Sequence, residues 1–332
     1  MPPIEPNQPA PTRAPGRSRF AYLGPAGTFT ETALRQVVSP DEVDYLPQID
    51  VVSAMEAVRS GDADYAVVAI ENSVEGGVTA VLDTLATGEP LVILREMLVP
   101  VSFTLAALGP ARLQDVRRVA AHPHAWAQCR RWFNQNLRGA VHVPASSNTA
   151  PAQELARLAA DPLAPAPAFD AALVPPAALA QYGLTALAAG VADNAAAVTR
   201  FVLIGHPGQT PEPTGADKTT MVVHLPAERS GALLELLEQF ATRGVNLTRI
   251  ESRPSGVALG RYSFSIDAEG HVADARMSEA MVGLHRFAPL VRYLGSYPRA
   301  DGAPIQVMEG TLDKDFRAAH DWVAAVRAGT QV

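Results

Sequence analysis

The chain alternates short apolar runs with segments in which apolar residues recur at helical spacing. The apolar runs predict strands in RFAYLG (19–24), ADYAVVAIEN (63–72), LVILREMLVPVSFTL (91–105), RVAAH (118–122), AVHVPA (140–145), DAALVP (170–175) and TRFVLIG (199–205). Helical spacing predicts helices over 28–38, 50–60, 76–87, 123–137, 148–160 and 175–182. Such alternation indicates an α/β fold with mainly parallel sheets. Two compact sheets with a cleft between them fit this pattern.

The pattern changes after HPGQTPEPTGAD (206–217), whose density of Pro and Gly is typical of a domain boundary. The elements that follow have the order strand, helix, strand, strand, helix, strand, which indicates a ferredoxin-like βαββαβ unit. The first helix is expected to begin near Ser230. Its spacing predicts four buried side chains, Leu233, Leu237, Phe240 and Ala241.

The predicted organisation has five parts. They are a disordered Pro-rich arm at 1–18, a two-lobed α/β domain at 19–206, a linker at 207–217, the ferredoxin-like domain at 218–298 and a C-terminal extension at 299–332. The extension includes a helix at 312–328 with an apolar stripe that is expected to pack on a neighbour. The stripe consists of Leu312, Phe316, Ala319, Val323 and Val326.

Composition narrows the function classes. The net charge of −7 argues against a nucleic-acid-binding protein, which usually carries a basic stripe. The most apolar stretch (91–109) is interrupted by Arg95, Glu96 and Pro100, which argues against a membrane span. The N-terminus has no apolar signal-peptide core, and the single cysteine, Cys129, suits a reducing compartment, so a cytoplasmic location is expected.

Segment 22–34, YLGPAGTFTETAL, reads as a strand, a turn with Gly24 and Gly27, and a helix start with Thr28 and Thr30. The free N–H groups and the dipole of a helix start favour an anion. An ordinary turn with a threonine cap is the alternative. The third glycine of a dinucleotide fingerprint and the Gly-Lys-Ser/Thr of a P-loop are both missing from this segment.

Two further strand ends carry more hydroxyl, amide and carboxylate groups than a turn requires. The first has Glu71, Asn72, Ser73 and Glu75, for which a solvated loop is the alternative. The second has Ser146, Ser147, Asn148 and Thr149. Helix capping explains one of these residues, and ligands of open α/β sheets bind beyond the carboxyl ends of strands. These turns therefore predict a cleft for a small carboxylate ligand.

The segment AAHPHAWAQCRRWF (120–133) contains His122, His124 and Cys129. A structural zinc site needs four ligands at characteristic spacings, and no second cluster of ligands is found in the sequence. We therefore interpret the segment as a strand end, a proline at a helix start and a half-buried cysteine. By themselves, Glu251 and Arg253 are interpreted as a surface charge pair.

Thr199, Arg200 and Phe201 open the last strand before the linker. Arginine is almost never fully buried unless it is paired, so Arg200 is expected to face solvent or an anion. The hydroxyl-rich turns favour the second interpretation, in which Arg200 is the cation of the cleft.

Seven segments, in their order along the chain, resemble the prephenate dehydratase family, in its monofunctional form with a C-terminal ACT regulatory domain. They are GPAGTFTETA, AIENSVEGGV, HPHAWAQC, SNTA, YGL, TRF and NLTRIESRP, between about 19 and 298. The resemblance implies two α/β lobes arranged as in type 2 periplasmic binding proteins. It implies conversion of prephenate to phenylpyruvate with loss of water and CO2 in phenylalanine synthesis, and inhibition by phenylalanine bound to the ACT domain.

The resemblance also assigns roles to residues. The essential threonine of the TRF motif falls on Thr199, which we expect to donate a hydrogen bond to the departing hydroxyl, with Glu71 or Glu75 as an assisting acid. Arg200 is assigned to a retained carboxylate. Further substrate contacts are expected from Thr28, Phe29, Asn72, Ser73, Asn148, Thr149 and Phe201. Phenylalanine contacts are expected from Gly231, Ala232, Leu233, Asn246, Leu247, Glu251, Ser252, Arg253 and Pro254.

Pairing of ACT and catalytic domains implies a homodimer or homotetramer, and the reaction needs no metal or organic cofactor. Three positions depart from the family pattern: Ala197 replaces a frequent Asn, Phe103 a frequent His and Asn148 a frequent Ser. We interpret them as supporting positions. Two alternatives stay open, an arogenate dehydratase, whose substrate differs by an amino group, and a non-catalytic amino-acid sensor.

Overall fold

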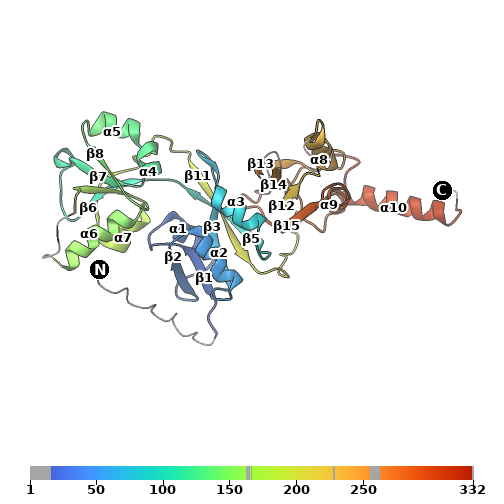
Figure 1. Cartoon of the computed structure of the whole chain (residues 1–332), viewed down its shortest axis with the longest axis horizontal. Helices are drawn as coiled ribbons and strands as arrows, with labels where there is room; N and C mark the ends of the chain where they lie inside the picture. The colour runs from blue at the N-terminus through green and yellow to red at the C-terminus, as the bar shows by residue number, and fades with distance from the viewer. Residues whose placement is uncertain (1–15, 162–164, 166, 227–228, 255–261, 331–332) are drawn as a thin grey trace.

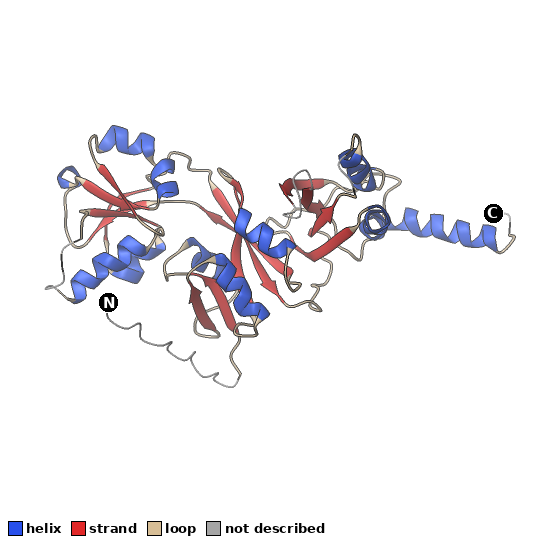
Figure 2. Cartoon of the chain, viewed as in Figure 1, coloured by secondary structure: helices blue, strands red, loops and turns tan. Residues whose placement is uncertain are grey.

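Three sheets follow one another along the long axis of the chain, with helices packed on their faces (Figures 1 and 2). The computed structural model describes residues 16–161, 165, 167–226, 229–254 and 262–330. Most of the predicted arm at 1–18 therefore lies outside the described residues. The α/β class and the division into two lobes and a ferredoxin-like unit are confirmed. The expectation of mainly parallel sheets is wrong, because each of the three sheets contains antiparallel strand pairs.

The first lobe is built on a sheet of order β2-β1-β3-β11-β5, with β4 paired to β3. Its strands are β1 (Arg19–Leu23), β2 (Asp44–Gln48), β3 (Tyr65–Asn72), β4 (Gly76–Gly77), β5 (Val92–Pro100) and β11 (Val198–Gly205). Its helices are α1 (Phe29–Leu34), α2 (Val51–Arg59) and α3 (Thr79–Ala86). β1, β2 and β3 are parallel, whereas β11 lies antiparallel between β3 and β5.

The second lobe is built on a sheet of order β10-β6-β9-β7-β8. Its strands are β6 (Thr104–Ala107), β7 (Arg118–Ala121), β8 (Val141–Pro144), β9 (Ala171–Val174) and β10 (Thr185–Ala189). Its helical segments are η1 (Leu113–Asp115), α4 (Pro123–Gln128), α5 (Arg130–Asn136), α6 (Ala150–Ala160) and α7 (Ala177–Tyr182). The chain enters this lobe after β5 and returns at β11, so two crossings connect the lobes.

The third sheet has the order β13-β14-β12-β15, which is that of a ferredoxin-like unit. Its elements are β12 (Asp217–His224), α8 (Ala232–Ala241), β13 (Leu247–Pro254), β14 (Tyr262–Glu269), α9 (Ala275–Phe287) and β15 (Leu290–Pro298). β15 packs against β5, and Leu294 and Tyr297 belong to the same buried apolar core as Ile70 and Ile93 of the first lobe. The third sheet is therefore docked on the first lobe through a shared core.

Two predicted elements differ in the structure, and two observed strands were not predicted. The run at 91–105 is two strands in different sheets, because Val101 leaves the first sheet and its N–H bonds the carbonyl of Ala197 at 2.8 Å. The helix predicted at 123–137 breaks at Cys129 into α4 and α5. β2 and β10 were not predicted, since neither DYLPQ nor TALAA carries a strong apolar alternation.

The predicted buried face of α8 was partly wrong. The helix begins after Gly231, which has a φ of +83°, and Ser230 does not cap it. The side chains it buries are Ala232, Leu236 and Phe240, whereas Leu233 is 42 % exposed and Ala241 is exposed. Phe240 is common to the predicted and the observed buried faces. The observed buried face is therefore rotated about the helix axis relative to the predicted one.

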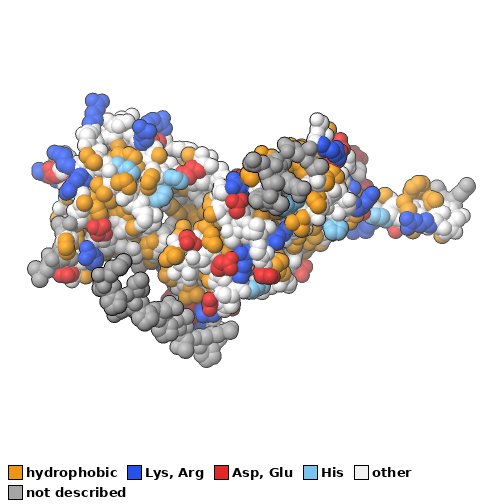
Figure 3. Space-filling view, in the orientation of Figure 1, with side chains coloured by type: hydrophobic (Ala, Val, Ile, Leu, Met, Phe, Trp, Pro, Cys, Tyr) orange, Lys and Arg blue, Asp and Glu red, His pale blue; other side chains and the backbone are white. Residues whose placement is uncertain are grey.

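The helix α10 (Asp313–Arg327) extends away from the rest of the chain (Figure 1). It contacts α9, where His320 lies 3.1 Å from Glu279, but it fully buries none of its own residues. Val326 of the apolar stripe is 52 % exposed, and Figure 3 shows hydrophobic side chains along this helix. The expected packing of the stripe is thus incomplete within the described chain. Among the described helices, none is long and apolar enough to cross a membrane.

Gly295 tests the seam between the third sheet and the first lobe. It has a φ of +129°, and a Cβ there would lie 2.3 Å from the carbonyl oxygen of Ile93. We expect Gly295→Ala to destabilise the protein by about 1–3 kcal/mol more than a glycine substitution without a clash. Gly302→Ala is the matched control, since Gly302 also has positive φ but open space around it. Equal melting temperatures for both variants would contradict close docking of β15 on β5.

Candidate active site

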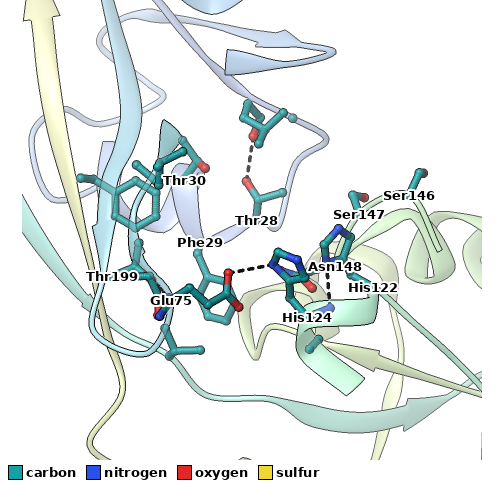
Figure 4. A pocket seen from close by; sticks show the side chains of 18 of the residues that line it. Thr28, Phe29, Thr30, Glu75, His122, His124, Ser146, Ser147, Asn148 and Thr199 are labelled. Atoms are coloured by element: carbon teal, nitrogen blue, oxygen red, sulfur yellow. Dashed lines mark hydrogen bonds and ion pairs between the residues drawn. The ribbon is translucent and has the colours of Figure 1, made fainter. Parts of the chain in front are cut away.

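A cavity of about 910 Å³ lies between the two lobes, within the size range of small-molecule sites. The first lobe lines it with the turns after β1, β2 and β3 and with the beginning of β11. The second lobe lines it with the start of α4 and with residues 146–148 and 150 (Figure 4). The strand ends singled out in the sequence therefore meet at one cavity.

Thr199 lies at this cavity, and its hydroxyl oxygen already accepts a hydrogen bond. Asn72 donates a hydrogen bond from Nδ2 to the Thr199 hydroxyl oxygen at 2.8 Å. The Asn72 Oδ1 in turn accepts from the backbone N–H of Val74 at 2.8 Å, which fixes the amide. The Thr199 hydroxyl thus keeps its own proton for a partner, and it borders the cavity.

Arg200 does not lie at the cavity, which corrects its assignment to a substrate carboxylate. Successive residues of a strand point to opposite faces, so Thr199 and Phe201 line the cavity while Arg200 points away. Its guanidinium contacts Glu96 at 2.6 Å and Tyr297 at 2.7 Å and also pairs with Asp267. Arg200 is therefore buried against the third sheet.

The turn before α1 is not a free anion site. Thr28 is the helix cap: its hydroxyl accepts from the Glu31 N–H at 3.2 Å and donates to the Leu23 carbonyl at 3.2 Å. The Glu31 carboxylate accepts the Gly27 N–H at 2.5 Å, so the protein's own carboxylate occupies this helix start. Thr28 still lines the cavity, but its hydroxyl proton is already donated to the Leu23 carbonyl. Thr30 also lines the cavity with its hydroxyl group.

The turn at 146–150 is only partly committed to capping. Ser147 accepts from the Ala150 N–H at 2.9 Å, while the buried Oδ1 of Asn148 lacks a hydrogen-bond partner. Asn148 lines the cavity, so this acceptor is available to a ligand donor. Thr149 is fully buried and does not line the cavity, nor does Ser73, which instead pairs with Val198 at 2.9 Å.

His122 and His124 are site residues that sequence reasoning did not assign, and they lie beside Glu75, which was expected as an assisting acid. His124 Nδ1 lies 2.8 Å from the Glu75 carboxylate and joins the two lobes, and Gln128 donates to the same carboxylate at 3.1 Å (Figure 4). His122 caps α4 by accepting the His124 N–H at 3.3 Å. Burial, and then the neighbouring His124, lower the pKa of His122. The sequence signal that could have identified these residues was the pair of segments AIENSVEGG and HPH, each of which places polar residues at the end of a predicted strand.

The charge of the cavity is unusual for a site that would take an anion. Among its described lining residues there is no Lys or Arg, and Glu75 is the one acidic side chain. The two histidines are the groups that can carry positive charge there. Charge at this site is therefore coupled to protonation.

Aromatic side chains form the apolar wall of the cavity. Phe29 and Phe103 meet edge to face with ring centroids 5.6 Å apart, and Phe201 lines the same space. Phe103 is one of the positions that depart from the family pattern, and here it supplies packing. Ala197, another such position, is buried beside the crossing between the lobes and does not line the cavity.

Cys129 is fully buried, and burial raises its thiol pKa to about 12. Among the described residues, no cluster of three or more His, Cys, Asp or Glu side chains is arranged to hold a metal ion.

The predicted phenylalanine-binding residues occupy two places on the third sheet. Gly231, Ala232 and Leu233 form the start of α8, whereas Leu247 to Pro254 form β13. Asn246 donates to Glu269 at 3.1 Å. Arg253 pairs with Asp83 of α3 at 3.1 Å rather than with Glu251, so the predicted surface pair is wrong.

Comparison with known proteins gives one family. The family model for prephenate dehydratase matches residues 20–209. A prephenate dehydratase of Amycolatopsis methanolica is 46 % identical over 315 residues, covering 95 % of this chain and 99 % of its own. The chain belongs to the prephenate dehydratase family.

Solved structures give the same family and one different activity. The crystal structure of a prephenate dehydratase from Arthrobacter aurescens in complex with L-Phe has a TM-score of 0.86 at 51 % identity, covering 93 % of this chain and 99 % of that one. GqqA, described as a novel type of quorum-quenching acylase, has a TM-score of 0.73 at 28 % identity, covering 84 % and 97 %. The same architecture therefore occurs with a second described activity, so the side chains of the cavity decide which chemistry a given member performs.

The lowered pKa of His122 predicts a pH dependence of stability. The unfolded chain binds this proton more tightly, so His122 costs stability as the pH falls through about 6.5 toward its lower folded value. We expect His122→Asn, which keeps a capping acceptor, to lose less melting temperature between about pH 7.5 and pH 5.5 than the wild type does. The exposed His206→Asn is the control and should follow the wild type. Identical pH slopes for all three proteins would refute the burial effect.

Proposed function

We propose that this protein converts prephenate to phenylpyruvate, with release of water and CO2, in the cavity between its lobes. The observation that carries the proposal is the Thr199 hydroxyl, whose oxygen accepts from Asn72 at 2.8 Å while its proton remains free at the cavity. A hydroxyl that accepts one hydrogen bond becomes a better donor of its own, because hydrogen bonds in chains polarise one another.

The reaction asks for such a donor. The bond between the ring and its carboxylate breaks, and the electron pair enters the ring as CO2 leaves. The bond between the ring and the hydroxyl breaks, and the departing oxygen takes up a proton to become water. Negative charge therefore grows on that oxygen in the transition state, where a positioned donor lowers the barrier. The apolar wall of Phe29, Phe103 and Phe201 suits the ring that becomes aromatic.

The proton and the positive charge come from the second lobe in this proposal. Prephenate has two carboxylates, and Arg200 faces away from the cavity. We assign recognition of a carboxylate to His122 and His124, the ionisable bases of the described lining. Glu75 holds His124 in place, and the His124–Glu75 pair is the proton source for the leaving oxygen. Glu71 is not part of this arrangement, since it lies outside the cavity lining and contacts Arg200 at 3.4 Å.

We further propose that residues 218–298 form an ACT regulatory domain that binds phenylalanine. The ferredoxin-like order of its strands and the L-Phe complex of the Arthrobacter aurescens relative support this. The same proposal includes a catalytic domain at 19–206, a linker at 207–217, a homodimer or homotetramer, and a cytoplasmic location. Arogenate is the second substrate to test. Its amino group would need an acid, and Glu75 is already engaged by His124 and Gln128.

Thr199→Ala tests the catalytic role directly. Loss of one transition-state donor should lower kcat for phenylpyruvate formation by about 100- to 1,000-fold. Thr199→Ser keeps the hydroxyl and should retain a much larger share of the activity. The product is measured by its ultraviolet absorbance in alkali, with prephenate and arogenate assayed in parallel. A Thr199→Ala protein with wild-type kcat would remove Thr199 from the mechanism.

His124→Gln tests the source of positive charge. Glutamine can still hydrogen-bond Glu75 but cannot become cationic. We expect KM for prephenate to rise and its pH dependence to flatten, because an imidazolium binds a dianion better than a side chain that cannot become cationic. Steady-state kinetics between about pH 6 and pH 8.5 measure both quantities. Gln181→Ala, at an exposed position outside this cavity, is the control. An unchanged KM–pH profile would leave carboxylate binding to other groups.

A further inference from the structure

Arg200 is the centre of an ion cluster that joins the first lobe to the third sheet. Arg200 is buried, with only 6 % of its surface exposed. Its Nε bonds Glu96 of β5 at 2.6 Å, its Nη2 bonds Tyr297 of β15 at 2.7 Å, and its Nη1 pairs with Asp267 of β14. A guanidinium is a planar fork of donors, and here each of its three nitrogens is bound to a different strand.

Asp267 is shared between Arg200 and the neighbouring strand β13. Its carboxylate accepts from Arg249 Nε at 2.9 Å and Nη2 at 3.1 Å, and from the Thr220 hydroxyl at 2.8 Å. Burial alone would raise the pKa of Asp267, but the two guanidinium groups outweigh it and hold that pKa far below its usual range. Asp267 thus remains ionised, and the positions of Arg200 and Arg249 depend on each other.

The other side of β11 carries the catalytic threonine. Thr199 pairs with Asn72 and Arg200 with Glu71 in the ladder with β3, and the register shifts between Arg200 and Phe201. Such a bulge re-aims side chains and is held by its surroundings. The anchored guanidinium therefore sets the orientation of the backbone that presents Thr199 to the Asn72 amide.

β13 also contacts a turn that lines the cavity. The Glu251 carboxylate lies against Gly77, where a Cβ would come within 2.0 Å of its oxygen, and Gly77 lines the cavity. Glu251 is also 3.8 Å from Arg249, whose Nη1 lacks a hydrogen-bond partner. A ligand that moves β13 would therefore act on Arg249 and on the turn beside the cavity together.

We infer that Arg200 is a positioning residue that orients Thr199 and transmits the state of β13 through Asp267 to the catalytic strand. This inference rests on the proposed function of the cavity and of the third sheet. Asp267 is the common acceptor, so a displacement of Arg249 must redistribute its hydrogen bonds with Arg200. A coupling of this kind needs two arrangements that the effector binds unequally.

Arg200→Lys is the test variant, because it keeps the charge but cannot bind three acceptors as a fork. We expect kcat to fall with little change in KM for prephenate. We also expect phenylalanine to bind by calorimetry as in the wild type, while the concentration for half-inhibition rises at least about tenfold, within the range of typical couplings. Arg249→Lys perturbs the cluster from the effector side and should lose inhibition while keeping most of kcat.

Arg292→Gln is the matched control. Arg292 also joins the third sheet to the first lobe, by donating to the carbonyl of Gly88 at 3.0 Å, but it does not contact the cluster. It should keep wild-type kcat and inhibition. If Arg200→Lys is inhibited like the wild type, or if Arg292→Gln loses inhibition equally, Arg200 has only a structural role.

Amide hydrogen exchange of β11 separates this inference from the proposed activity. Phenylalanine should change the exchange of residues 198–205 in the wild type and leave it unchanged in Arg200→Lys, whatever substrate is turned over. Absence of prephenate turnover by the wild type overturns the proposed function alone. Absence of an effect of phenylalanine on β11 in the wild type overturns the inference.

Discussion

A buried guanidinium must have its hydrogen-bond donors satisfied, and Arg200 satisfies them from strands of two sheets. This requirement determines how the third sheet lies on the first lobe, because Glu96, Asp267 and Tyr297 must converge on one planar group. Breaking such a buried pair typically costs about 3–5 kcal/mol, since it leaves a charge without a partner. The docking of the two domains and the geometry of β11 are therefore one constraint, and the site depends on it through Thr199.

The cavity on the other face of β11 has the opposite electrostatic character. It has no permanent cation among its described lining residues, so its charge depends on two histidines held near Glu75. Such a site can bind a dianion and supply a proton with the same groups, which a permanent guanidinium could not do. The absence of a permanent cation from the described lining also avoids tight binding of the carboxylate that leaves as CO2, since tight binding of that group would oppose its loss.

The sequence was sufficient for the fold class, because strand–helix alternation and the βαββαβ order are local patterns. It was insufficient for the break at Val101, since an apolar run buried in two different sheets looks the same as one long strand. Thr28 and Glu31 form a capping signature that could have been recognised, and it would have removed the anion site at α1. Arg200 was misassigned although strand alternation already separates it from Thr199 and Phe201. Its partners Asp267 and Tyr297 come from the third sheet, and no sequence pattern indicated them.

The ion cluster around Arg200, which connects the first lobe to the third sheet, responds to displacement differently from the apolar contacts beside it. The apolar part of the seam, around Leu294 and Tyr297, tolerates small sliding because dispersion contacts have no fixed direction. The cluster around Arg200 does not, because a hydrogen bond weakens steeply when its angle departs from the preferred range. A small displacement of β13 therefore changes which bonds Asp267 makes before it changes the packing of the core. Packed interfaces respond to such shifts by switching between discrete arrangements. One strand with a hydroxyl on one face and a guanidinium on the other is thus suited to convert an event at the third sheet into a change at the cavity.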